Sequence, residues 1–420
     1  MGRKEKEMNK KYKIRSDYLF LFLMILINTC FFGFYGFLPF AQNFYIYDYK
    51  YILILFVSFI FFFFSLIKNR FKIKFSKSNR LLTISFFLII LLEVVLSYIS
   101  YHQPIILVLK EASYNIIILF AYFTFVQLYK SLNFEEILKL IVIFGLITSS
   151  ISLFSAFIFN HFNINILGLV IENASIRNDK VRFFIGEETV ILGVIISITR
   201  IFSKKNKTID VLNIIISLLQ IYFVSQTRSL ILYLILIILL ILFFNKKTNL
   251  TLKLLMISVS SIFILYIILN FRDIETYINS YIGGDSSISI RFKTIDFYMN
   301  QFYQKPWFGM GYISSSKDID DWQLLYGPEG YYYRSDVGII GNLNQYGIIG
   351  LLWIIAFFYK NIKYSAKEKQ ISIYHLIIFN FSAFLMLSLI NLSFLTVQLL
   401  MYLFYILIFS FIHEKTSTIR

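Results

Sequence analysis

The chain is dominated by about twelve continuous apolar stretches, many of them near the roughly 20 residues that a helix needs to cross a bilayer. They lie at residues 18–38, 51–67, 81–99, 113–129, 137–159, 188–202, 210–226, 229–244, 251–271, 342–359, 371–391 and 393–412. Their apolar residues are continuous and do not alternate, which excludes a transmembrane β-barrel. With 58% hydrophobic residues, a soluble domain would have too little polar surface to face water. The sequence therefore predicts an all-α polytopic membrane protein.

The positive charge of the chain predicts its topology. Most of the 40 Lys and Arg residues lie in segments that share one side of the membrane, namely 1–17, 68–80, 130–139, 200–207, 246–253, 360–369 and 413–420. The positive-inside rule then predicts that both termini are cytoplasmic and that the number of spans is even. The net charge of +16 is thus explained by orientation in the membrane, and nucleic acid is not an expected partner.

One long polar and aromatic segment, residues 272–341, interrupts the apolar stretches, and we expect it to face outward and carry the chemistry. The remaining predicted parts are a cytoplasmic tail (1–17), transmembrane helices one to nine (18–271), helices ten to twelve (342–412) and a second cytoplasmic tail (413–420).

Within this loop, apolar residues at helical spacing predict a helix over 288–303, ended by the Lys305-Pro306 pair. Glycines at 309 and 311 and at 327 and 330 predict tight turns. The loop is therefore expected to be a small helical cap held against the bundle.

Arginine is enriched on the predicted outer side of the membrane relative to lysine. The outer arginines are Arg177, Arg182, Arg228, Arg272, Arg291 and Arg334. A guanidinium group binds phosphate or carboxylate through two parallel hydrogen bonds, whereas a topology signal alone would not discriminate between the two cations. Recognition of an anionic substrate is therefore predicted, with interfacial anchoring as the alternative for each arginine.

Four motifs, in this order along the chain, resemble those of the O-antigen polymerase and O-antigen ligase superfamily (the Wzy-like proteins). They are 182–186 at the start of a span, the turn 226–229, Arg291 followed by 306–311, and 336–350 at the return to the membrane. The resemblance covers roughly residues 70–412. Ligases of this superfamily carry a His at that return, whereas the four His residues of this chain all lie outside the large loop. The departure disfavours a ligase.

The resemblance implies a polymerase on the outer face of the bacterial cytoplasmic membrane that extends a glycan carried on undecaprenyl diphosphate. The product would be a capsule, exopolysaccharide or O-antigen. A hydroxyl of the acceptor would attack the anomeric carbon of the donor, and undecaprenyl diphosphate would leave. The implied partners are lipid-linked glycans and the bilayer, with a chain-length regulator and a flippase as further partners. A ligase is the nearest alternative, and a lipid-linked oligosaccharide flippase is the alternative from another class.

The candidate catalytic residues are Asp336, as a base, and Arg291, as the cation that meets the leaving diphosphate. Arg182, Arg228 and Arg334 are candidate ligands of the substrate. Among the loop carboxylates Glu329 is a further candidate, with a solvated surface role as the alternative for both acids. Trp307 and Tyr332 are candidates for stacking on sugar rings, and membrane anchoring is the alternative.

The run Asp318-Ile319-Asp320-Asp321 has the spacing of a cation site in nucleotide-sugar enzymes. Nucleotide sugars are cytoplasmic and this segment is predicted to face outward, so a solvated turn is favoured, with Ca²⁺ as the alternative. Because arginine can supply the positive charge, we expect no metal and no cofactor. Glu93 and Glu111 are carboxylates in or beside predicted spans and receive no role.

Overall fold

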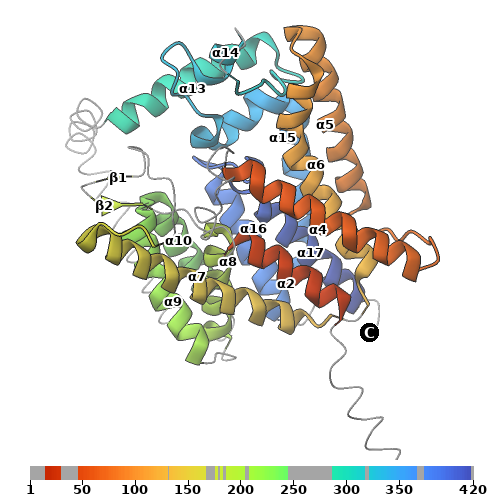
Figure 1. Cartoon of the computed structure of the whole chain (residues 1–420), viewed down its shortest axis with the longest axis vertical. Coiled ribbons are helices and arrows are strands. Elements are labelled where there is room, and N and C mark those ends of the chain that lie inside the picture. Colours follow the sequence, from red (N-terminus) through yellow and green to blue (C-terminus); the bar gives the residue numbers. More distant parts are fainter. Residues whose placement is uncertain are drawn as a thin grey trace, which may run out of the picture.

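The computed structural model describes residues 15–29, 46–130, 132–166, 176–177, 180–182, 186–203, 208–244, 286–316, 321–366 and 373–417. Within them the fold is almost entirely helical (Figure 1). The helices are α2 (Ser16–Asn28), α4 (Ile46–Lys68), α5 (Arg80–Tyr101), α6 (Ile105–Leu128), α7 (Phe134–Phe162), α8 (Glu187–Phe202), α9 (Thr208–Gln220), η4 (Ile221–Ser225), α10 (Arg228–Phe244), α13 (Ser286–Gln304), α14 (Trp322–Tyr326), η5 (Arg334–Val337), α15 (Gly338–Ala366), α16 (Ile373–Ser388) and α17 (Leu400–Ser417). A short antiparallel pair, β1 (Ile176–Arg177) and β2 (Lys180–Val181), completes the described elements.

Among the described residues, six helical segments are long and apolar enough to cross a membrane, which confirms a polytopic α-helical membrane protein. They are α4, α5, α6, α7, α9 with η4, and η5 with α15. The shorter apolar helices α2, α10 and α16 accompany them. The predicted span 251–271 and the second half of 18–38 lie outside the described residues, so the number of about twelve stays a prediction.

Burial separates the helices at the centre of the bundle from those at its surface. Residues 188–200 of α8 and 400–413 of α17 are buried without interruption, so both helices lie inside the bundle. In contrast, α4 leaves Phe56, Phe59 and Phe63 exposed along one face. An uninterrupted row of exposed phenylalanines fits a helix that faces lipid, because in water such a row would be costly.

Some of the connecting segments that were predicted to share the cytoplasmic side contact one another through hydrogen bonds and ion pairs. At one end of the bundle, Arg200 pairs with Glu135 at 2.6 Å, and Ser76 Oγ donates to Glu414 Oε2 at 3.1 Å. All four residues lie in segments predicted to be cytoplasmic or directly beside them. The C-terminus is at this end, opposite α13 and α14 (Figure 1). Which end faces the cytoplasm remains a prediction of the positive-inside rule.

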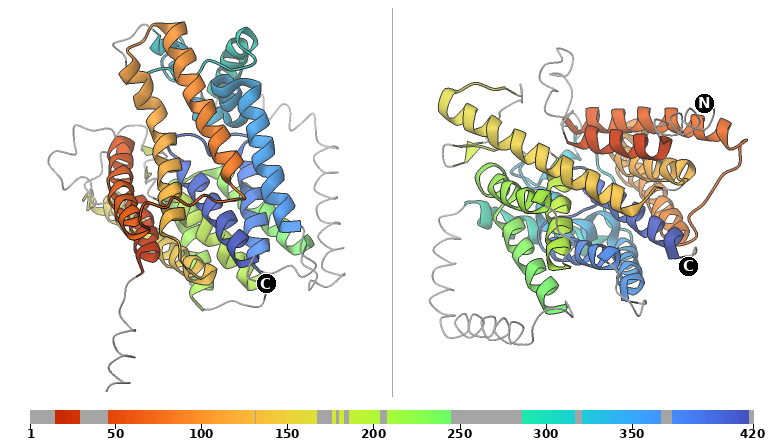
Figure 2. Two further views of the ribbon diagram at one scale, coloured as in Figure 1. Left: turned by 90° about the vertical axis from the view of Figure 1, so that its right-hand side faces the viewer. Right: turned by 90° about the horizontal axis from the view of Figure 1, so that it is seen from below.

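The cap consists of α13, α14, η5 and their connections, and it lies on long helices that extend beyond the rest of the bundle. Figure 2 shows α5, α6 and α15 reaching towards it. The expected helix over 288–303 is confirmed as α13, which ends at Gln304, directly before Lys305 and Pro306. Asn344 Nδ2 of α15 donates to Tyr298 O (3.2 Å) and Gln301 Oε1 (2.8 Å) of α13. The cap is therefore tied to the bundle by buried polar contacts.

The cap and α15 also interlock through their backbones. At Gly347 (φ 60°, ψ −159°) the helix α15 is interrupted. In a regular helix the N–H groups of residues 348 and 349 would donate to the carbonyls of residues 344 and 345. Here the turn 306–311 takes up all four groups: Met310 N donates to Asn344 O (2.6 Å), Gly311 N to Gln345 O (2.9 Å), Ile348 N to Pro306 O (2.8 Å) and Ile349 N to Trp307 O (3.2 Å).

The glycines of both segments face this interlock, which explains their positions. A Cβ on Gly309 (φ 70°) would lie 2.6 Å from Asn344 O, and one on Gly347 would lie 2.6 Å from the nitrogen of Gly309. Only glycine allows the two backbones to approach this closely. The motif 306–311 and the segment around Gly347 therefore form one structural unit, although they are about forty residues apart in the sequence.

Candidate functional site

A cavity of about 200 Å³ lies where the cap meets α6 and the connection between α16 and α17. The cap supplies mainly aromatic residues and one arginine, α6 supplies one carboxylate, and the connection supplies residues 395–398. The polar and aromatic side chains around it include Glu111, Asn115, Tyr312, Tyr326, Tyr332, Tyr333 and Arg334. A concave site that joins a few polar groups to aromatic walls is typical of a small-molecule or sugar site.

Among the described residues that line this cavity, Arg334 is the cation, and two of its donors have no hydrogen-bond partner there. The residue is 9% exposed, and its Nη1 donates to Gly311 O at 2.9 Å. Its Nε and Nη2 have no hydrogen-bond partner among the residues that the structure describes. A buried donor without a partner costs about 1–3 kcal/mol, more when the group is charged. An anion with several oxygens would satisfy both donors, as phosphate does with arginine.

Glu93 lies beside Arg334, in α5. It is 1% exposed, and within the described part of the chain neither of its carboxyl oxygens has a hydrogen-bond partner. Arg334 and Lys305 are the cations whose charges act on it. Gly311 separates the two groups, since a Cβ on Gly311 would lie 3.0 Å from Glu93 Oε2. A buried acid close to two cations thus lies next to the site, outside the described lining of the cavity.

Glu111 lines the same cavity and joins α6 to the cap. Its Oε1 accepts hydrogen bonds from Ser315 N (3.2 Å) and Ser315 Oγ (2.7 Å). Beside it on α6, Asn115 Nδ2 donates to the Tyr312 hydroxyl at 3.1 Å, and that hydroxyl lies 3.0 Å from the hydroxyl of Tyr346. Glu111 was not among the candidates from the sequence, because it appeared to lie at the beginning of a lipid-embedded helix.

Two of the predicted site residues, Arg334 and Tyr332, line this cavity together. Tyr332 is 5% exposed, and its ring occupies the place where a side chain on Gly327 would lie. It therefore also holds the second turn of the cap. Because its ring is packed in this way, its contribution to sugar binding would be limited to one edge of the ring.

Arg291 and Asp336 are brought together elsewhere on the cap. Both side chains are exposed, and the charge of Arg291 acts on the carboxyl group of Asp336. Asp336 Oδ1 accepts a hydrogen bond from Ser335 Oγ at 3.2 Å. Neither Arg291 nor Asp336 is among the described residues that line the cavity of Arg334.

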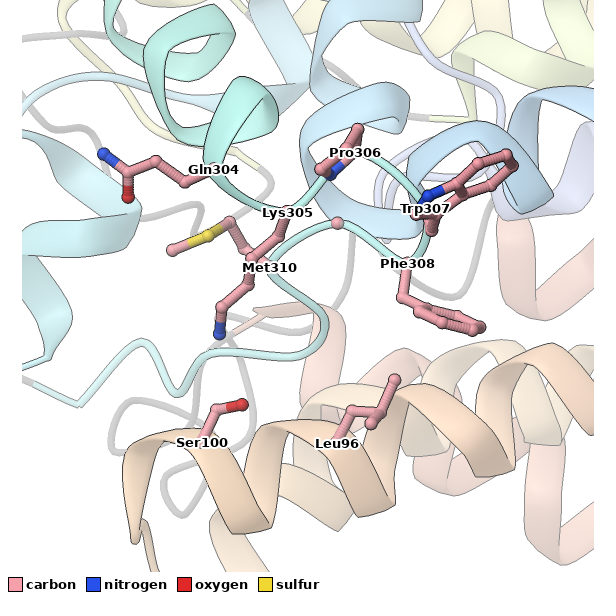
Figure 3. A pocket seen from close by; sticks show the side chains of 9 residues that line it. Leu96, Ser100, Gln304, Lys305, Pro306, Trp307, Phe308 and Met310 are labelled. Carbon is pink, nitrogen blue, oxygen red and sulfur yellow. The ribbon is translucent and has the colours of Figure 1, made fainter.

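Glu329 and Trp307 lie at two further places on the cap. Glu329 forms an ion pair with Lys293 at 3.5 Å, and both side chains are exposed. Trp307 is 63% exposed and lines a second pocket of about 260 Å³ between the turn 304–310 and α5. In Figure 3, Phe308 and Lys305 point from this turn towards Leu96 and Ser100 of α5.

Lys305 is held in place in this second pocket. Its Nζ donates to the Tyr101 hydroxyl at 3.2 Å and lies 4.5 Å from the centre of the Tyr101 ring. Burial lowers the pKa of Lys305 below its ordinary value, and the nearby Glu93 carboxyl opposes that shift.

The first two sequence motifs meet at the turn after η4. Arg182 Nε donates to Ser225 O at 3.1 Å, so the residue is held against the segment that leads into 226–229. Arg228 is the first residue of α10, and its side chain lies outside the described residues. Asp318 and Asp320 also lie outside them, while Asp321 Oδ2 accepts a hydrogen bond from Gln103 Nε2 at 3.2 Å.

A comparison with known protein families gives a match over the part of the chain that contains the cap. Residues 213–355 match the family described as O-antigen ligase. No curated protein matches the chain. The matched residues extend from α9 into α15, so they contain Arg291, the interlock at Gly347 and the buried Arg334. This match agrees with the order of the motifs and supports the resemblance of the chain to the O-antigen polymerase and ligase superfamily over this segment.

Proposed function

We propose that the protein polymerises undecaprenyl-diphosphate-linked oligosaccharide repeat units into a surface polysaccharide on the outer face of the bacterial cytoplasmic membrane. The observation that most supports this proposal is the buried Arg334, whose Nε and Nη2 donors have no partner among the described residues. Arg334 lines a cavity between the cap and helices that carry the apolar surface of the bundle. A lipid-linked diphosphate has the anionic head group for the cavity and the apolar tail for the bundle.

The proposed reaction is a displacement at the anomeric carbon of the donor. A hydroxyl oxygen of the acceptor forms the new bond to this carbon while the bond to the diphosphate oxygen breaks. The electron pair leaves with the diphosphate, so negative charge increases next to the guanidinium group of Arg334. Preorganised donors at the place where charge develops are usually the largest single contribution to catalysis. Tyr326 and Tyr333, which line the same cavity, would orient the sugars.

The remaining predicted residues keep proposed roles outside this cavity. Arg291 would attract the diphosphate to the surface of the cap, and Asp336 beside it was the base predicted from the sequence. Arg182 and Arg228 would meet a second lipid-linked diphosphate near the turn 226–229, as a polymerase binds two such substrates. Glu329 and Trp307 would contact the sugars of the growing glycan on the cap surface.

A ligase of the same superfamily would use the same donor and the same cavity. The absence of a His residue from the large loop of the sequence favours the polymerase. A flippase would instead be expected to carry its charges through the bundle midplane between pseudo-symmetric halves. The cap, with a buried arginine at a cavity lined by aromatic side chains, favours an enzyme.

The experiment that tests the proposal is incubation of the purified protein with the lipid-linked repeat unit, followed by gel electrophoresis of the glycan. A polymerase produces a ladder of products that differ by one repeat. A ligase produces a product only when a different acceptor is added. A flippase leaves the length of the glycan unchanged while moving it across a vesicle membrane.

A further inference from the structure

We propose that Glu111 of α6 is the general base that accepts the proton of the acceptor hydroxyl. This inference rests on the proposed polymerase function and names the residue for its proton transfer. Glu111 lines the same cavity as Arg334, whereas Asp336 and Glu329 lie outside the described lining of that cavity.

A displacement reaction restricts where the base can lie relative to the leaving group. The attacking hydroxyl and the leaving diphosphate must lie on opposite sides of the anomeric carbon, so base and guanidinium must belong to different walls of one cavity. Arg334 reaches the cavity from η5 in the cap, and Glu111 reaches it from α6 in the bundle. The cavity thus has a cationic group and an anionic group on separate elements, as the reaction requires.

The carboxylate of Glu111 is held in place by Ser315. Both hydrogen bonds from Ser315 end on its Oε1, at 3.2 Å from the backbone nitrogen and 2.7 Å from the hydroxyl. These two hydrogen bonds fix the position of the carboxylate at the wall of the cavity. A fixed carboxylate can orient a hydroxyl for attack at little entropic cost.

The backbone next to Ser315 is also held by contacts that do not involve Glu111. Gln103, in the connection between α5 and α6, accepts a hydrogen bond from Ser314 N at 3.0 Å and donates to Asp321 at 3.2 Å. The segment that carries Ser315 is therefore tied to the bundle on both sides. Anchoring of the cap therefore does not depend on Glu111 alone.

The proton balance of the step is simple. As the acceptor oxygen bonds to the anomeric carbon, its proton passes to the carboxylate of Glu111. The electron pair of the broken carbon–oxygen bond leaves with the diphosphate, which Arg334 neutralises. Glu111 then releases the proton to water before the next cycle, and no oxidant, reductant or further reactant is needed.

The test compares Glu111→Gln with the wild-type protein in the polymerisation assay. The amide oxygen of glutamine can still accept both hydrogen bonds from Ser315, so the cap stays anchored while the base is lost. General bases contribute about 10²–10⁴-fold. We expect kcat to fall by that factor with KM for the lipid-linked repeat unchanged. In Glu111→Ala, added formate should restore part of the rate, because a small carboxylate can occupy the vacated space.

The matched control is Gln103→Ala, which weakens a neighbouring anchor of the cap without changing the cavity lining. We expect a change of only a few fold in this variant and no response to formate. If wild type forms a ladder and Glu111→Gln stays within a few fold of it, the assignment of Glu111 is overturned. The assignment of Glu111 is also overturned if Gln103→Ala loses as much activity as Glu111→Ala and formate restores activity in neither variant. If wild type itself forms no ladder, the polymerase proposal fails, and the role of Glu111 with it.

Discussion

The interlock between the cap and α15 predicts that Gly347→Ala will release the cap while the bundle stays folded. Alanine at φ 60° and ψ −159° would enter a region of backbone conformation that is almost confined to glycine, which costs about 1–3 kcal/mol. The new Cβ would also lie 2.5 Å from the carbonyl carbon of Trp307 and 2.6 Å from the nitrogen of Gly309. Both are backbone atoms, which cannot rotate away, and overpacking of this kind costs about 1–3 kcal/mol.

The two effects together give about 2–6 kcal/mol against the docked cap. Since about 1.4 kcal/mol is a factor of ten, the lower value already raises the population of undocked cap about 30-fold. The assay is the rate of trypsin cleavage within α13 in the purified protein, because cleavage follows the open population when reclosing is fast. Polymerisation should fall in parallel, because Arg334 and Gly311 are then no longer held together.

The matched control is Gly193→Ala in the buried helix α8. Its added Cβ would lie 3.3 Å from the side-chain nitrogen of Asn213 and 3.6 Å from Ile141 O, well clear of the 2.4–2.6 Å approaches at Gly347. We expect cleavage of the cap in this variant to match wild type. Equal cleavage rates in wild type and Gly347→Ala would refute the interlock as the connection that holds the cap.

Arg334→Lys keeps the positive charge but loses the planar fork, so polymerisation should fall by about 10²-fold or more at normal expression; a wild-type rate would remove Arg334 from the reaction. Arg291→Ala should also lower the rate strongly, and if it does not, Arg291 only anchors the cap. Polymerisation should persist in excess EDTA, because arginine supplies the positive charge; a loss that Mg²⁺ or Ca²⁺ restores would favour the aspartate run as a cation site. In a Cys30→Ser background, Lys77→Cys and Ser315→Cys should label oppositely with an impermeant maleimide in intact cells, and equal labelling would contradict the predicted topology.

Local signals in the sequence were sufficient to predict the parts of the cap. The apolar spacing of 288–303, followed by Pro306, predicted α13 and its end. The glycines predicted the turns, and positive φ angles at Gly309 and Gly327 confirm them. The interlock could not be predicted from the sequence, because it joins two segments that are far apart in the chain and neither segment shows its partner.

The candidate site was predicted only in part, and the geometry of η5 explains why. A 3₁₀ helix has three residues per turn, so residues two apart point in different directions. Arg334 is buried and lines the cavity, while Asp336 is exposed and lies outside the described lining. Glu111 was passed over because it was interpreted as a carboxylate within the fourth span, whereas in α6 (Ile105–Leu128) it lies in the second turn, against the cap. Glu111 and its neighbour Lys110 follow Pro104 closely. Two adjacent charges so soon after a proline could have indicated that this end of the helix lies near the cap.

The length of the glycan that the purified protein makes from the lipid-linked repeat unit tests most directly whether the protein is a polymerase that uses Arg334. We expect wild type to produce a ladder of products differing by one repeat, and Arg334→Lys to leave nearly all of the repeat unextended while retaining the fold of the bundle. The account would be contradicted if wild type, folded and bound to the repeat, never extended it, or if Arg334→Lys produced the same ladder at the same rate.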